Sequence, residues 1–165
     1  DGTGTGIQSS DDKFGPLTCI SGTIRTKGDV YVQTVDSRYP TSTTGKAITA
    51  HMTELGAEHG CTFEVLSDAV PFYIDPSSPE ITTLLDTFHE YPGSDEQAFV
   101  IGGGTYARHF KRAVAFGPYD SKAAKDLPEW VGMAHGPDEG ISEEWLKRAL
   151  KIYIVSISRL MQLDL

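Results

Sequence analysis

The order of apolar and polar residues along the first part of the chain predicts a β-hairpin. Residues 17–26 are rich in β-branched side chains, and residues 30–35 alternate between apolar and polar. Between these two runs stands Lys27-Gly28-Asp29, whose glycine suits a tight turn. Asp36-Ser37-Arg38-Tyr39-Pro40 then closes the second strand, because proline cannot continue a hydrogen-bonded ladder.

A helix and two further strands are predicted next. Apolar residues recur close to helical spacing up to about His59, either Thr43 or Thr44 can cap the start, and Gly60 suits the position after a helix end. Residues 61–66 and 70–74 have the apolar, β-branched character of strands. Strands and a helix in this order indicate an α+β fold, with the helix on one face of an antiparallel sheet.

The second half of the chain predicts two helices around short strands. A helix begins at Pro79 and runs to about residue 91. A longer helix with a wide apolar stripe spans residues 142–161, and Ser142 is its predicted N-cap. Residues 98–101 read as a short buried strand and residues 113–116 as a second short apolar strand, and the last helix is expected to pack on their sheet. Residues 119–140 are irregular, and such a long structureless span is more often functional than idle.

The best candidate for a domain boundary is Asp75-Pro76-Ser77-Ser78-Pro79, which contains two prolines and two serines. It divides the chain into a domain of residues 1–75 and a domain of residues 76–165.

Composition narrows the class of protein. The chain has 165 residues, 39% of them hydrophobic and 22% charged, which suits a folded globular protein. The formal net charge of −9 argues against binding to nucleic acid or to an anionic membrane surface, and no apolar run is long enough to span a membrane. Cys19 and Cys61 lack paired zinc-ligand spacing and read as free, buried thiols of a reducing compartment, the cytoplasm.

Three consecutive glycines, Gly102, Gly103 and Gly104, follow the apolar run that ends at Ile101. Adjacent glycines suit a sharp turn, or a place where another group must approach bare backbone. Thr105 can cap a short helix after them, so the turn could present free N–H groups to a carboxylate or phosphate. A tight turn that binds no ligand is the alternative.

Two side chains stand out as candidates for chemistry. His135 lies in a loop of small and acidic residues, where a histidine can be a metal ligand, a general base or a hydrogen-bond donor. Arg38 ends a predicted strand and can present its guanidinium group to a carboxylate. The alternatives are a partly exposed loop histidine and a surface ion pair. Asp138 and Glu139 could assist a metal, although acids just before a helix more often serve its N-terminus.

Four segments carry a further clue, and they occur in this order: Asp36-Ser37-Arg38-Tyr39-Pro40, Gly102-Gly103-Gly104-Thr105-Tyr106-Ala107-Arg108, Ala113-Val114-Ala115-Phe116-Gly117-Pro118 and Ala134-His135-Gly136-Pro137-Asp138-Glu139. Together they resemble a series in the C-terminal half of the di-zinc dipeptidases. These are the Xaa-His (carnosinase-like) and PepV-like members of the aminoacylase and glutamate-carboxypeptidase superfamily of metallopeptidases. The last helix also looks like the closing helix of that family, and the resemblance covers roughly residues 17–165.

The resemblance implies a two-domain enzyme in which a lid domain is inserted into a catalytic domain that holds two zinc ions, or another divalent metal in their place. Residues 1–75 would form half of a ferredoxin-like lid of antiparallel strands plus a helix. Residues 76–165 would form the C-terminal part of the α/β zinc-peptidase catalytic domain. The implied reaction is hydrolysis of the peptide bond of a dipeptide or short peptide by metal-activated water, with a glutamate as general base.

The resemblance also implies roles for individual residues. By position, His135 matches the C-terminal metal ligand of the family. Arg38 matches the lid arginine that holds the substrate carboxylate. Gly103, Gly104 and Thr105 match the turn that helps to bind the substrate backbone.

One departure from the family is decisive, because its His-x-Asp segment, Glu-Glu pair and further acids have no match here. Catalytic zinc normally needs three protein ligands and an open position, which one histidine cannot supply. We therefore expect this chain to be a C-terminal fragment of a zinc-dependent dipeptidase that is inactive alone. An exposed sheet edge and apolar face would favour pairing with the missing N-terminal catalytic portion, or formation of a homo-oligomer.

Two other classes of function stay open from the residues alone. The chain could be a non-catalytic α+β module in which Arg38 and the glycine turn hold a small anion without metal. It could also be a lid-type oligomerisation module, whose function lies in an interface.

Overall fold

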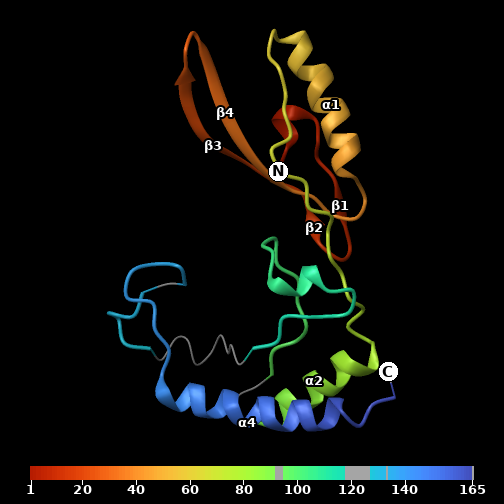
Figure 1. Cartoon of the computed structure of the whole chain (residues 1–165), viewed down its shortest axis with the longest axis vertical. Helices are drawn as coiled ribbons and strands as arrows, with labels where there is room; N and C mark the ends of the chain where they lie inside the picture. Colours follow the sequence, from red (N-terminus) through yellow and green to blue (C-terminus); the bar gives the residue numbers. More distant parts are fainter. Residues whose placement is uncertain (92–94, 118–126, 133, 165) are drawn as a thin grey trace. The chain divides into compact units, whose positions relative to one another are not determined.

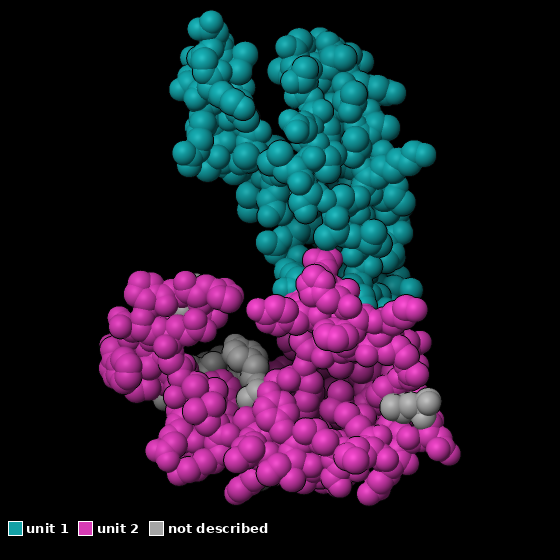
Figure 2. Space-filling model, viewed as in Figure 1, with its two compact units in different colours: residues 1–73, 100–104 teal, residues 74–99, 105–165 magenta. Residues whose placement is uncertain are grey.

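The computed structural model describes residues 1–91, 95–117, 127–132 and 134–164. The chain divides into two compact units (Figure 2), unit 1 with residues 1–73 and 100–104, and unit 2 with residues 74–99 and 105–165. The described secondary structure consists of two small antiparallel sheets, three α-helices and two short 3-10 helices, so the predicted α+β class is confirmed (Figure 1). The assignment of residues 1–75 to a ferredoxin-like lid and of residues 76–165 to an α/β catalytic domain stays a prediction.

The predicted hairpin of unit 1 is confirmed. It consists of β3 (Thr18–Lys27) and β4 (Val30–Arg38), which pair in antiparallel register. Gly28 lies in the turn with a φ of 61°, a left-handed conformation that glycine adopts without steric cost. The hairpin places Arg38 at the end of β4.

The remaining strands of unit 1 lie near its N-terminus. Residues Thr3–Thr5 form the 3-10 helix η1, and the short strands β1 (Ser10–Asp11) and β2 (Gly15–Pro16) pair with each other. Ile7, Leu17 and Pro40 are buried apolar side chains of unit 1.

Helix α1 (Gly45–Glu58) also matches its prediction. The hydroxyl of Thr44 accepts a hydrogen bond from the backbone N–H of Ala47 at 3.1 Å, and Gly60 follows the helix with a φ of 68°. Nε2 of His51 lies 2.7 Å from the carbonyl oxygen of Thr5, which ties the helix to η1.

Four predicted strands are absent from the described structure. Residues 61–66, 70–74, 98–101 and 113–116 form neither strand nor helix. The predicted burial is also wrong at residues 98–101, where Phe99 is 74% exposed. Apolar, β-branched runs favour extended backbone, but a strand also needs a partner for its ladder, and local sequence does not supply one.

The predictions for the loops and thiols have mixed outcomes. Residues 127–132 and 134–140 contain turns and bends, apart from an isolated bridge between Gly132 and Glu139. Pro118 and residues 119–126 lie outside the described residues. Both cysteines are free, but the predicted burial is wrong, because Cys19 is only partly buried and Cys61 is exposed.

Unit 2 is built on two helices, α2 (Pro79–His89) and α4 (Glu143–Leu160), which pack against each other. The predicted packing of the last helix on a sheet is therefore wrong, since the strands of that sheet do not form. The predicted cap is confirmed, because the hydroxyl of Ser142 accepts from the N–H of Trp145 at 3.1 Å. The buried apolar side chains are Ile81, Leu84, Phe88, Trp145, Ala149 and Ile152.

Polar contacts join the ends of these two helices. Nη1 and Nη2 of Arg159 lie 2.6 and 2.9 Å from the two carboxylate oxygens of Glu90. Nη1 also donates to the hydroxyl of Thr87 at 3.0 Å, and Thr87 is fully buried. The contact lowers the pKa of Glu90 and raises the pKa of Arg159, as expected for a bidentate ion pair.

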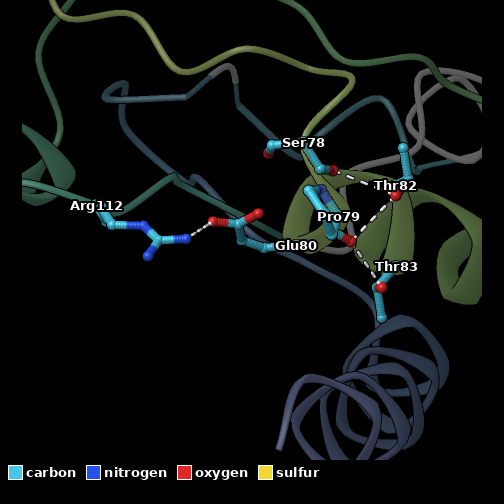
Figure 3. Close-up of polar contacts among 6 residues, drawn as sticks. All are labelled: Ser78, Pro79, Glu80, Thr82, Thr83 and Arg112. Carbon is cyan, nitrogen blue, oxygen red and sulfur yellow. Dashed lines mark hydrogen bonds and ion pairs between the residues drawn. The ribbon is translucent and has the colours of Figure 1, made fainter. Parts of the chain in front are cut away.

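The start of α2 is held by contacts within the chain (Figure 3). Arg112 forms an ion pair with Glu80 in the first turn. The pKa of Glu80 is lowered, first by a hydrogen bond from its own backbone N–H and next by Arg112. The hydroxyls of Thr82 and Thr83 donate to the carbonyl oxygen of Pro79 at 3.0 and 2.7 Å. These contacts lie within the first turns of α2, whose N-cap residue, Ser78, makes no side-chain capping hydrogen bond.

An aromatic cluster holds residues 113–117 on the helix pair. The ring of Phe116 meets the rings of Phe88 and Tyr153 edge to face, with centroid distances of 6.3 and 6.0 Å. The hydroxyl of Tyr153 donates to the carbonyl oxygen of Phe116 at 3.3 Å. Side-chain packing therefore fixes a segment that the sequence predicts as a strand.

Candidate functional site

Arg38 stands at the end of β4 with its side chain about half exposed. Its Nε lies 3.4 Å from Oδ1 of Asp36. The two residues are two positions apart in one strand, so their side chains are on the same face of the hairpin. The surface ion pair that the sequence left as an alternative is therefore present. This ion pair engages Nε of Arg38, and the two terminal nitrogens of the guanidinium group take no part in it.

The glycine turn reaches Arg38 within unit 1. A Cβ atom added at Gly102 would lie 3.2 Å from Cδ and 3.4 Å from Nη1 of Arg38. These distances are tighter than ordinary van der Waals contact, so a side chain at position 102 would push the arginine aside. The end of β4 and the glycine turn are thus neighbours in unit 1. They are distant in the sequence, and each of them was selected separately in the sequence analysis.

The other residues of the turn have different surroundings. A Cβ atom at Gly103 would meet only Cδ1 of Ile101, at 3.8 Å, so the backbone there is open. The hydroxyl of Thr105 accepts from the N–H of Ala107 at 3.3 Å and caps the 3-10 helix η2 (Tyr106–His109). The predicted capping role of Thr105 is confirmed, and its role in substrate binding stays a prediction.

His135 lies in unit 2, exposed at the tip of a closed loop. The N–H of Gly132 donates to the carbonyl oxygen of Asp138 at 2.9 Å, which closes the loop. The backbone N–H of His135 donates to Oε2 of Glu139 at 2.9 Å. His135 and Asp138 have φ values of 65° and 59°, a left-handed conformation that is costly for residues with a side chain. Glu139 therefore shapes the loop rather than serving the helix that follows.

Among the residues that the structure describes, the donor atoms needed for a metal site are incomplete. In the described ranges, no group of three or more His, Cys, Asp or Glu side chains could hold a metal ion. A zinc site needs at least three protein ligands, so His135 can supply one ligand but not a site. The role of His135 as a ligand stays a prediction.

Two acidic residues near the site escaped the sequence analysis. Asp36 could have been found from its spacing of two residues from Arg38 in a predicted strand. Asp68 accepts from the hydroxyl of Tyr39 at 2.7 Å, and a Cβ atom at Gly45 would overlap its carboxylate. Asp68 thus occupies the N-terminus of α1, a contact between distant segments for which the sequence holds no local signal.

No helix in the described ranges has the length and apolar character of a membrane span.

Comparison with known proteins places the chain beside bacterial proteins named as dipeptidases. No family model matches it. The chain is 31% identical over 157 residues to "Putative dipeptidase YtjP" of Bacillus subtilis, an alignment that covers 93% of the chain and 31% of that relative. It is 32% identical over 101 residues to "Putative dipeptidase SSP1012" of Staphylococcus saprophyticus, covering 61% of the chain and 20% of the relative. A "Putative dipeptidase" of Staphylococcus epidermidis is 32% identical over 100 residues, with the same coverage.

The chain thus spans between a fifth and a third of the length of these relatives. Their names support the predicted resemblance at the level of dipeptidases. The finer assignment to di-zinc, PepV-like enzymes stays a prediction.

Proposed function

We propose that the chain is part of a zinc-dependent peptidase that hydrolyses dipeptides or short peptides. Similarity to proteins named as dipeptidases extends over 93% of the chain and supports the reaction class. The proximity of Arg38 to Gly102 is the structural observation that carries the proposal, because it places a cation beside the glycine turn, whose backbone is open at Gly103.

In this proposal, Arg38 binds the C-terminal carboxylate of the substrate. A guanidinium group can donate two parallel hydrogen bonds to a carboxylate, and charge-assisted bonds of this kind are strong. Asp36 contacts Nε and so restrains the side chain, while Nη1 faces the glycine turn. Gly103, Gly104 and Thr105 would bind the backbone of the substrate through their own backbone groups.

Zinc is the proposed cofactor of the complete protein, with His135 as one of its ligands. The imidazole is exposed on a loop that backbone hydrogen bonds hold closed, which suits a ligand that meets a metal shared with other residues. Because the described residues do not form a full zinc site, the remaining ligands would come from polypeptide beyond the described residues.

The role of Arg38 can be tested in a chimera in which this chain replaces the aligned segment of the B. subtilis relative. We expect Arg38→Ala to lower kcat/KM for a dipeptide with a free C-terminal carboxylate by about 10- to 100-fold, from the loss of one charge-assisted contact. The same dipeptide with an amidated C-terminus should be hydrolysed equally by both proteins.

The matched control is Arg25→Ala, which removes a cation from β3 of the same hairpin. Equal losses for both substrates would show that Arg38 does not recognise the carboxylate. A folded, zinc-loaded chimera that hydrolyses no dipeptide would overturn the proposed reaction.

A further inference from the structure

Helix α4 carries a second apolar stripe that faces away from α2. Its members are Leu146, Leu150, Ile154, Ile157 and Met161, all of them more than half exposed. At 3.6 residues per turn, these five positions fall within about 80° of the helix circumference. We call this stripe the outer face of α4.

The outer face is distinct from the face that packs on α2. Ile154 is 60% exposed, whereas Ile152, two residues earlier, is 1% exposed. The centres of the two faces are about 130° apart around the helix. A helix with apolar residues on opposite sides is typical of a position between two packed layers, not of a protein surface.

The outer face is also long and continuous. It follows most of the 18 residues of α4, and the ion pair of Lys147 with Glu143, at 2.6 Å, borders it at the start. Scattered apolar side chains are normal on a surface, but a contiguous stripe marks a surface that another element covers.

We infer that the outer face of α4 is covered by an apolar surface of polypeptide outside these 165 residues, belonging to the portion that the longer relatives have in addition. The B. subtilis relative aligns with 93% of this chain through only 31% of its own length, so most of that protein is additional polypeptide. This inference builds on the proposed function, because it assumes the same kind of complete protein.

Other parts of unit 2 support this occupant. Phe99 is 74% exposed and Phe110 is 63% exposed, and both lie in segments without strand or helix. Unit 2 therefore exposes large apolar side chains in more than one place, as expected if it forms part of a larger hydrophobic core. A second copy of the chain is a poorer occupant, because it would bring together two chains of net charge −9.

The test compares the isolated chain with the chimera described above. The outer-face variant combines Leu150→Gln, Ile154→Gln and Ile157→Gln. We expect it to lower the melting temperature of the chimera by about 5 °C or more, because three buried apolar side chains become polar. In the isolated chain, the same variant should leave the melting temperature unchanged or higher, since these side chains are exposed there.

The control variant combines Lys147→Gln, Lys151→Gln and Ser158→Gln, which lie beside the outer face on the same helix and are exposed. It should have no effect on the melting temperature of either protein. The corresponding outer-face substitutions in the B. subtilis relative itself provide a second measurement that does not depend on folding of the chimera.

Two results would overturn the inference. One is equal melting temperatures of the outer-face and control variants in both the chimera and the relative. The other is an isolated chain that sediments as a dimer and becomes monomeric in the outer-face variant, which would make a second copy the occupant. Because the readouts are stability and mass, failure of the chimera to hydrolyse dipeptides would count against the proposed function alone.

Discussion

Asp11 shows how a single carboxylate joins two segments of unit 1 that are distant in the sequence. It accepts hydrogen bonds from the hydroxyl and the backbone N–H of Thr41, both at 2.6 Å, and from the N–H of Phe14 at 2.7 Å. These contacts, led by the Thr41 hydroxyl, lower the pKa of Asp11 from 3.8 to about 2. Hydrogen bonds to the charged form have this effect because protonation would remove an acceptor.

The lowered pKa predicts an acid-sensitive contact. Because the folded-state pKa lies below the unfolded value, the stabilisation is complete above pH 3.8 and is lost as the pH falls through about 2. An NMR titration should therefore show the amide protons of Thr41 and Phe14 shifting with a midpoint near pH 2. Asp11→Asn should abolish that titration, whereas Asp12→Asn at the neighbouring exposed position should preserve it. A midpoint near pH 4 would contradict the hydrogen-bond arrangement.

Single residues also show which features the sequence can predict. The caps at Thr44, Thr105 and Ser142 were predicted correctly because a cap depends on residues within one turn. The contact between Arg38 and Gly102 was not predictable from local pattern, since it joins two distant segments. The sequence marked each partner separately, and only the fold placed them together.

At the scale of elements, helices were predicted more successfully than strands. The periodicity of α1, α2 and α4 is local, and each helix formed close to its predicted bounds. The hairpin formed because its partners are adjacent in the chain and joined by a glycine turn. Residues 61–66 and 98–101 have strand-like composition, but a ladder requires a second segment that the described structure does not provide.

The two faces of α4 predict different responses to the same substitution. Ile152→Ala should destabilise the isolated chain by about 2–4 kcal/mol, because it removes a buried side chain and leaves a cavity. Ile154→Ala should change the free energy of unfolding by less than about 0.5 kcal/mol, since this side chain is exposed. Urea unfolding followed by the fluorescence of the buried Trp145 measures both. Similar losses for the two variants would show that the outer face is already packed within the isolated chain.

At the scale of the whole molecule, the sequence indicated the dipeptidase resemblance through four ordered segments, and similarity to proteins named as dipeptidases supports it. The same sequence could not predict the apolar surface left on α4. Periodicity shows which residues of a helix are apolar, but it does not show how many neighbours cover them. The number of layers in a core depends on all the polypeptide that packs into it, and this chain aligns with 31% of the length of the B. subtilis relative.

The described residues hold too few donor atoms for a zinc site, and this predicts how the isolated chain behaves. With added zinc and a dipeptide, it should show no hydrolysis above the rate without protein, because His135 alone cannot form the three-ligand site that catalytic zinc requires. The chimera should hydrolyse the dipeptide, and His135→Ala should reduce both its zinc content, measured by metal analysis, and its kcat. Zinc content unchanged by His135→Ala would remove this histidine from the metal site. Hydrolysis by the isolated chain at the rate of the chimera would show that these 165 residues alone contain a complete catalytic metal site.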